Sequence, residues 1–247
     1  MTFIDVHCHL DICKNIPEII KNVKKSDVKI IITNGVNIET NRKTLELSEK
    51  YPLVKAALGI YPIEALKLSD KEIDKEISFI KENKDKIIAI GEIGLDYKED
   101  QSEHDRQKQI FKKFISLSLE LDKPIIIHSR KAEEETIEIL EIMHAKKVIM
   151  HCFSGNFLLV EKIAKNLWYL SIPASIKNSE HFQKMVNEIP LDRLLCETDS
   201  PFLHPDKLKN NTPDLVIESY KKIAEIKSLD LDKIKEKIYD NYKKLFL

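Results

Sequence analysis

The chain is poor in the residues that build disulfide-bonded or zinc-finger proteins. Its 247 residues include four cysteines, which are Cys8, Cys13, Cys152 and Cys196. They are too few and too dispersed for a disulfide framework, and no two of them form a Cys-x-x-Cys zinc motif. We therefore expect reduced cysteines that pack in the interior.

Long hydrophobic runs and an excess of charge of one sign are also missing. No stretch of 18 apolar residues is present, and the first strand-like run begins at Thr2 or Phe3, which leaves no room for a signal peptide. The formal net charge of −1 argues against a general surface attraction to nucleic acid, although a local basic rim is compatible with it. We expect a cytoplasmic protein without membrane contact, and nothing in the sequence indicates an obligate protein partner.

Glycine is scarce as well, with five in the chain, and no segment rich in Gly, Pro or Ser divides the sequence. What the chain contains instead is a regular alternation of apolar runs and amphipathic helical patterns. The strand-like runs cover residues 3–9, 28–34, 54–61, 87–92, 124–128, 147–151, 167–172 and 193–197. The helical patterns cover residues 17–26, 39–50, 70–84, 102–121, 131–144, 156–166, 180–189, 213–227 and 230–246.

Eight strands that alternate with helices predict a parallel barrel. A content of 33% charged and 43% hydrophobic residues is typical of a folded globular chain of this size. We therefore expect an α/β protein, a (β/α)8 TIM barrel that forms a single domain over residues 1–247. The last helical pattern is expected to be an extra C-terminal helix that closes one end or flank.

The first strand-like run carries two histidines one residue apart, in Asp5-Val6-His7-Cys8-His9. Side chains alternate along a strand, so His7 and His9 share a face. A polar strand face is the alternative interpretation of this pair. Further ligand-type residues end later runs, and the carboxyl ends of barrel strands meet at one mouth. We therefore expect a divalent metal site that gathers His7, His9, Glu92, His128, His151 and Asp199.

Five short motifs around these residues follow one another in chain order. They are His7-Cys8-His9-Leu10-Asp11, Gly91-Glu92-Ile93-Gly94-Leu95-Asp96-Tyr97, His128-Ser129-Arg130, His151-Cys152-Phe153-Ser154-Gly155 and Glu197-Thr198-Asp199-Ser200-Pro201. Together they resemble the signatures of the TatD-type metal-dependent hydrolases of the amidohydrolase superfamily, over essentially the whole chain. The resemblance implies a (β/α)8 barrel that hydrolyses DNA or another phosphodiester.

The resemblance also implies a site for two divalent metal ions (Zn, Mg or Mn). One ion would be held by His7, His9 and Asp199. The other would be held by His128 and His151, with Glu92 as the bridging ligand between the two.

Two positions depart from the pattern of that family. The chain reads Gly59-Ile60-Tyr61-Pro62 where members often have histidine in place of Tyr61. Tyrosine donates a hydrogen bond but is no near-neutral base. The loop after the last strand reads Lys209-Asn210-Asn211-Thr212-Pro213, without the Arg-Gly that members usually carry. Specificity for the leaving group or base can therefore differ.

Further residues near the mouth are candidate substrate contacts. Arg130 suits a phosphate because its guanidinium offers a bidentate fork, and a surface salt bridge is the alternative for this residue. Ser154 lies in a turn before a helix where backbone N–H groups can receive an anion. Tyr97 is predicted to contact substrate, with loop structure as the alternative for Tyr97 and Asp96. Two carboxylates in phase with ligands, Asp5 and Glu197, are predicted to orient those ligands rather than bind metal.

The leading functional hypothesis is a metal-dependent deoxyribonuclease, with 3′–5′ exonuclease action as one form of it. Two cations lower the pKa of a shared water and clamp a phosphoryl oxygen. Asp199 is predicted to accept the proton of that water, while Glu92 bridges the cations. The alternatives are another metal-dependent ester or amide hydrolase, such as a D-aminoacyl-tRNA deacylase, and a non-catalytic metal-binding barrel.

Overall fold

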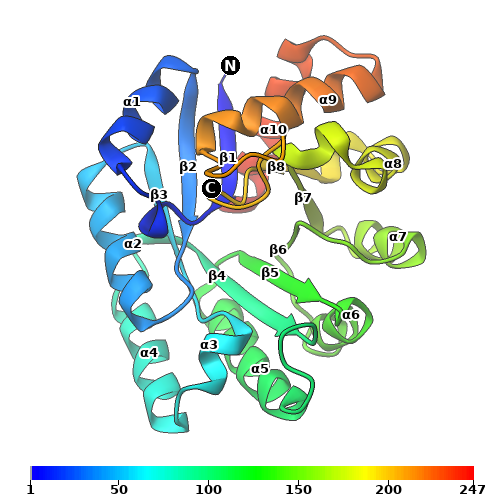
Figure 1. Cartoon of the computed structure of the whole chain (residues 1–247). Coiled ribbons are helices and arrows are strands. Elements are labelled where there is room, and N and C mark those ends of the chain that lie inside the picture. The colour runs from blue at the N-terminus through cyan, green and yellow to red at the C-terminus, as the bar shows by residue number, and fades with distance from the viewer. Residues whose placement is uncertain (1) are drawn as a thin grey trace.

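The computed structural model describes residues 2–247, and its centre is a parallel eight-stranded sheet that curls into a barrel (Figure 1). Neighbours in the sheet are neighbours in the chain: β1 (Phe3–Cys8), β2 (Val28–Asn34), β3 (Val54–Leu58), β4 (Ile87–Asp96), β5 (Ile125–Arg130), β6 (Val148–His151), β7 (Tyr169–Pro173) and β8 (Leu194–Glu197). The predicted (β/α)8 barrel class is confirmed.

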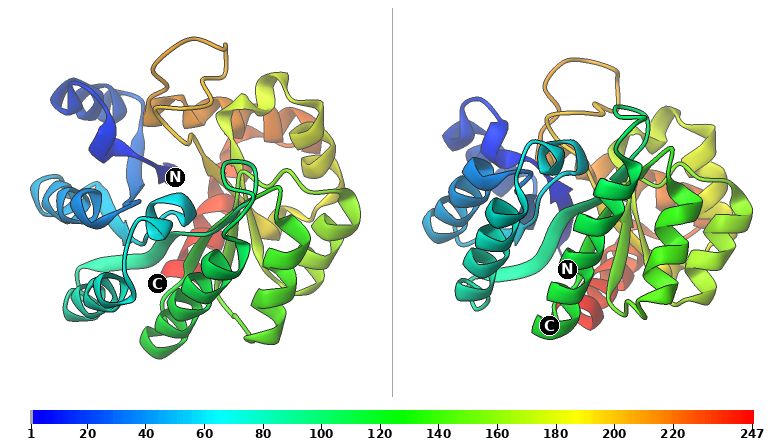
Figure 2. Two further views of the ribbon diagram at one scale, coloured as in Figure 1. Left: turned by 60° about the horizontal axis from the view of Figure 1, so that its bottom comes forward. Right: turned by 90° about the horizontal axis from the view of Figure 1, so that it is seen from below.

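Helices surround the strands, as Figure 2 shows from two further directions. They are α1 (Ile16–Lys25), α2 (Ile38–Lys50), α3 (Pro62–Leu66), α4 (Asp70–Glu82), α5 (His104–Leu121), α6 (Glu133–Ile142), α7 (Phe157–Lys165), α8 (Glu180–Glu188), α9 (Ile217–Lys227) and α10 (Leu231–Phe246). Among residues 2–247, no helix combines the length and apolar character that crossing a bilayer would require.

The first strand and the chain after the last strand close the barrel at their carboxyl ends. The backbone N–H of Asp199 donates to the carbonyl of His7 at 2.9 Å, and the N–H of His9 donates to the carbonyl of Ser200 at 2.7 Å. The closure therefore joins the two segments that carry three of the predicted ligands. It places residues almost 200 positions apart in one site.

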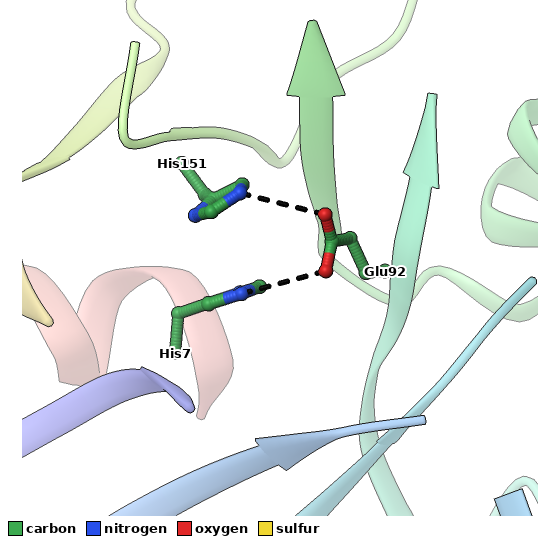
Figure 3. Close-up of side chains that lie close together, drawn as sticks. All are labelled: His7, Glu92 and His151. Carbon is green, nitrogen blue, oxygen red and sulfur yellow. Dashed lines mark ion pairs between the residues drawn. The ribbon is translucent and has the colours of Figure 1, made fainter. Parts of the chain in front are cut away.

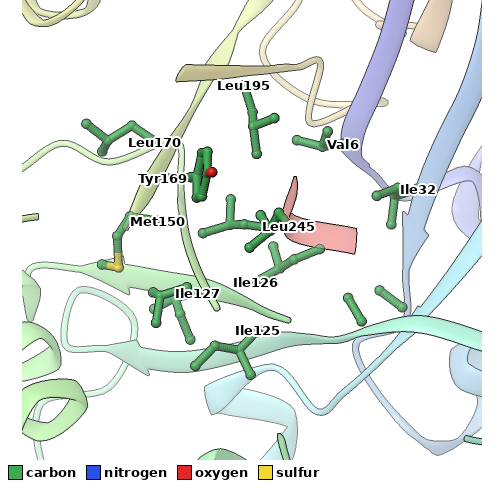
Figure 4. Close-up of a cluster of buried hydrophobic side chains, with 14 of the residues drawn as sticks. Val6, Ile32, Ile125, Ile126, Ile127, Met150, Tyr169, Leu170, Leu195 and Leu245 are labelled. Carbon is green, nitrogen blue, oxygen red and sulfur yellow. The ribbon is translucent and has the colours of Figure 1, made fainter. Parts of the chain in front are cut away.

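The core lies inside the barrel and between its strands and helices. Four of the eight strands, β1, β6, β7 and β8, are buried along their whole length because both faces of the sheet are covered. The predicted extra helix is α10, and its Leu245 lies among strand residues such as Val6 and Leu195 (Figure 4). The side chain of Asn241 in α10 donates to the carbonyls of Leu191 and Leu194, at the amino-terminal start of β8. Helix α10 therefore packs at the end of β8 that lies away from the predicted ligands.

Two predicted strands, β3 and β4, end three or more residues away from the expected position, while the ends of the other strands differ by two residues at most. Strand β3 ends at Leu58 rather than at residue 61, because Pro62 begins the short helix α3 that the sequence did not predict. Strand β4 continues from Glu92 to Asp96, because it pairs with β5 beyond the expected end. This pairing requires Gly94, since a Cβ there would lie 1.9 Å from the carbonyl oxygen of His128.

Candidate metal centre

The structure brings the six predicted ligands together at the carboxyl end of the barrel. His7 is fully buried, and His9, Glu92 and His151 are nearly so. Strand β1 supplies His7, and His9 directly follows it. Glu92, His128 and His151 come from β4, β5 and β6, and Asp199 comes from the turn after β8.

Glu92 occupies the middle of the cluster and divides it in two. Its Oε2 atom lies 3.5 Å from Nε2 of His7 and 3.3 Å from Nε2 of His9. Its Oε1 atom lies 3.0 Å from Nδ1 of His128 and 3.4 Å from Nε2 of His151. Figure 3 shows His7 and His151 approaching the two different oxygens. One carboxylate thus faces two separate pairs of imidazoles.

Asp199 completes the first half of the cluster. Its Oδ1 atom lies 3.5 Å from Nε2 of His7 and 3.4 Å from Nε2 of His9. Its backbone has a φ of 56°, a left-handed conformation that Asp and Asn adopt more readily than most other residues. This turn brings the carboxylate back over the end of β1.

The residues present fit a divalent cation. Both ring nitrogens of the fully buried His7 are without a hydrogen-bond partner, which is costly unless another group satisfies them. Two groups of three residues place their ligand atoms within 4.8 Å of one another inside each group. The groups are His7 with Glu92 and His151, and His7 with His9 and Asp199. Imidazole nitrogen and carboxylate oxygen are suitable donors for zinc and related ions.

Three further groups set the orientation of the imidazoles. Nδ1 of His9 lies 3.0 Å from the carbonyl oxygen of Asn34, and Nδ1 of His151 lies 3.3 Å from Oε1 of Glu197. Nε2 of His128 lies 2.9 Å from Oδ2 of Asp96. A ring N–H that donates to an oxygen leaves the opposite nitrogen free to bind metal. Each of these histidines therefore directs its other nitrogen toward Glu92.

The sequence left the role of Asp96 open, and the contact of Asp96 with His128 was not predicted. Asp96 is fully buried at the end of β4, where its Oδ2 also accepts a hydrogen bond from the hydroxyl of Tyr61 at 2.5 Å. Burial opposes ionisation, yet the hydrogen bonds from His128 and Tyr61 lower the pKa of Asp96 to about 2. Tyr61, where the family resemblance breaks down, thus supports the carboxylate that orients His128. The apolar run that continues to Leu95 was the available sign in the sequence that β4 extends as far as Asp96.

Asp5 contacts the backbone of His7 and both the backbone and the hydroxyl of Thr198, rather than an imidazole. Its carboxylate accepts hydrogen bonds from the N–H of Thr198 at 3.0 Å, from the Thr198 hydroxyl at 2.6 Å and from the N–H of His7 at 3.2 Å. Burial raises the pKa of Asp5 well above its usual value, although the bonds from Thr198 counteract it. Asp5 holds the turn before Asp199 against β1.

The two carboxylates of the cluster are held in the ionised form that binds a cation. Burial disfavours the ionised carboxylates, but the surrounding imidazoles outweigh it. His151 and His128 hold the pKa of Glu92 well below its usual value, and His7 and His9 likewise lower that of Asp199. Both carboxylates are consequently ionised at neutral pH and present negative charge to the site.

The predicted substrate contacts lie around the rim. Arg130 is half-exposed, with Nη1 3.2 Å from Oε1 of Glu99. The hydroxyl of Tyr97 donates to Glu135, and that of Ser154 donates to Glu133 at 3.0 Å. Tyr97 and Ser154 line a cavity of about 590 Å³. Its charged lining residues are four glutamates and one lysine, namely Glu133, Glu134, Glu135, Glu138 and Lys131. The negative charge of this cavity disfavours an anion there, so the side of the rim that carries Arg130 is the more favourable one for a phosphate.

Comparison with known proteins agrees with this geometry. The family model described as TatD related DNase matches residues 4–247. An uncharacterized metal-dependent hydrolase of Methanocaldococcus jannaschii is 39% identical over 99% of this chain and 96% of its own length. Deoxyribonuclease TATDN3 of Homo sapiens is 32% identical over 98% of this chain and 94% of its own.

The fold has close counterparts among solved structures. The crystal structure of YJJV, a TatD homologue from Escherichia coli K12, superposes with a TM-score of 0.93 at 25% sequence identity, covering 99% of this chain and 97% of that one. Fold, site and sequence thus agree along the whole length. The chain belongs to the TatD-related DNase family and is a metal-dependent hydrolase of the TatD type.

Proposed function

We propose that this protein is a two-metal deoxyribonuclease. The observation that carries the proposal is the division of Glu92 between two pairs of imidazoles. One ion would bind His7, His9 and Asp199, the other His128 and His151, and Glu92 would bridge them. Ligands of this kind accept zinc, magnesium or manganese. The name of the human relative, a deoxyribonuclease, supports DNA as the substrate.

The residues of the site have distinct tasks in this reaction. Divalent ions bound there supply positive charge for the phosphoryl oxygens and make water more acidic. Asp199, whose side chain is 14% exposed and whose pKa is low, orients the attacking water as an ionised carboxylate and receives its proton. Arg130 holds a non-bridging phosphate oxygen from the rim. The hydrogen bonds to Asn34, Glu197 and Asp96 keep the imidazoles aligned.

A parallel assay tests the substrate class. The metal-replete protein is incubated with single-stranded DNA, duplex DNA, RNA and D-aminoacyl-tRNA. We expect release of nucleotides from DNA. The aminoacyl ester alternative is not favoured, because TATDN3 of Homo sapiens is named a deoxyribonuclease and that of Mus musculus a putative deoxyribonuclease. Hydrolysis of the aminoacyl ester alone would overturn the proposal.

Arg130→Ala is expected to weaken binding of a phosphodiester. Loss of a charge-assisted hydrogen bond of about 1.5–3 kcal/mol corresponds to a rise of roughly 10- to 100-fold in KM for an oligonucleotide. Hydrolysis of a neutral ester should change far less. The matched control is Arg106→Ala, which removes another arginine that pairs with a surface carboxylate, Asp70. Equal losses on both substrates would contradict a phosphate contact.

Glu197→Gln is expected to lower metal affinity about 10- to 100-fold, the usual effect of losing a carboxylate that supports a histidine ligand. The amide keeps the shape of the side chain but loses the charge beside Nδ1 of His151. Competition with a fluorescent chelator measures the affinity. Glu225→Gln, which changes an exposed carboxylate paired with Lys222, is the control. An unchanged affinity would show that Glu197 does not support the ligand.

A further inference from the structure

One aromatic side chain stands exposed beside the metal centre. Phe202 is 53% exposed, and it is the only aromatic residue among residues 2–247 that is exposed rather than partly or fully buried. Its ring centroid lies 6.1 Å from that of His9, at an interplanar angle of 67°. The ring therefore borders the first half of the cluster and leaves about half of its surface open to solvent.

The backbone under this ring is firmly held. The N–H of Phe202 donates to the carbonyl of Asp199 at 2.8 Å, which ties the ring to a predicted ligand. The buried side chain of Asn211 donates to the carbonyls of Phe202 at 2.6 Å and of Thr198 at 2.8 Å. An exposed ring on a braced backbone is a preorganised contact surface, because binding to it costs little ordering of the loop.

Basic residues accompany the ring on the same loop. Lys207 and Lys209 are both exposed, and neither forms an ion pair with any other residue in the described range 2–247. The cavity on the α6 side is acidic instead, with Glu133, Glu134 and Glu135 among its lining residues. An aromatic face combined with free lysines is the arrangement that single-stranded nucleic acid prefers, since bases stack and phosphates pair with cations.

We propose that Phe202 is a stacking platform for a nucleobase next to the cleaved phosphodiester, and that it makes the protein prefer nucleotides over other phosphodiesters. This inference rests on the proposed deoxyribonuclease function. A base attached to a phosphate at the metal centre has its π face within reach of a ring that borders His9. Stacking of this kind depends little on which base is present.

The test compares single-stranded oligonucleotides that carry either a normal base or an abasic tetrahydrofuran residue on one side or the other of the cleaved bond. For the metal-replete wild type we expect kcat/KM to be about 5- to 100-fold higher with the base, the range expected for one stacked base. In Phe202→Ala this preference should fall toward 1. In Phe202→Tyr, which keeps an aromatic face, it should persist.

Leu208→Ala is the control, because Leu208 is a 66% exposed apolar residue of the same loop. It should keep the full preference for a base. A second readout is the fluorescence of 2-aminopurine in a bound oligonucleotide, which stacking quenches in the wild type and which Phe202→Ala should leave bright. A wild type that cleaves DNA with the same base preference as Phe202→Ala overturns the stacking role alone. A wild type that cleaves no oligonucleotide overturns the proposed function itself.

Discussion

Asp199→Asn is expected to reduce DNA hydrolysis by about 10²- to 10⁴-fold, the range that proton transfer by a positioned side chain contributes. The variant removes the carboxylate that lies 3.5 and 3.4 Å from Nε2 of His7 and His9. A neutral amide neither accepts the proton of the attacking water nor attracts a cation strongly. Asparagine also tolerates the left-handed backbone at this position, where φ is 56°, so the effect is separated from backbone strain.

The readout is kcat on a single-stranded oligonucleotide at saturating metal, with thermal unfolding measured on the same samples. Unfolding should be nearly unchanged, since the hydrogen bond from the N–H of residue 199 to His7 remains. Asp206→Asn is a matched control, because Asp206 is an exposed carboxylate in the same loop that pairs with Lys177. Full turnover by Asp199→Asn would rule out the role of Asp199 as proton acceptor.

The second large effect is expected for Glu92→Gln. In the proposed site, each oxygen of Glu92 would serve a different ion, so replacement of one oxygen by an NH₂ group would remove a ligand that both ions share. The amide hydrogens would also point at an imidazole nitrogen that should face metal. We expect the metal content to fall from two ions per chain to one or fewer, with a loss of DNA hydrolysis of at least about 100-fold.

Elemental analysis after gel filtration in metal-free buffer measures this content. Glu49→Gln serves as the control, since Glu49 is an exposed carboxylate that pairs with Lys86. An unchanged stoichiometry in Glu92→Gln would discount the bridge, whatever the activity. A wild type that holds one ion per chain would contradict the two-metal proposal directly.

The barrel itself was predictable from local patterns. Apolar runs and amphipathic segments alternate eight times, and parallel strands joined by helices form few other closed structures. The predicted end of β4 was wrong because pairing with a strand distant in the sequence sets where that strand ends. Strand β4 extends to Asp96 because β5 pairs with it, which a glycine at position 94 permits at close range. No local property of Gly94 indicates a strand.

The grouping of the candidate ligands followed from one geometric rule. Residues that end parallel barrel strands face the same mouth, so His7 and Asp199 could be placed in one site from their positions in the sequence alone. The orienting groups were harder to foresee. The carbonyl of Asn34 and the carboxylate of Asp96 reach His9 and His128 through contacts across neighbouring strands. The apolar run to Leu95 indicates at most that β4 continues to Asp96, and no local pattern specifies either contact.

The sequence by itself determined the alternation of strands and helices and the residue types at the strand ends, because side-chain periodicity is a property of the local chain. Only the tertiary structure decided which oxygen of Glu92 faces which histidines, that Tyr97 and Ser154 donate to glutamates, and that Phe202 stands exposed beside His9. These are distances between segments far apart in the chain, and they depend on how the closed barrel packs.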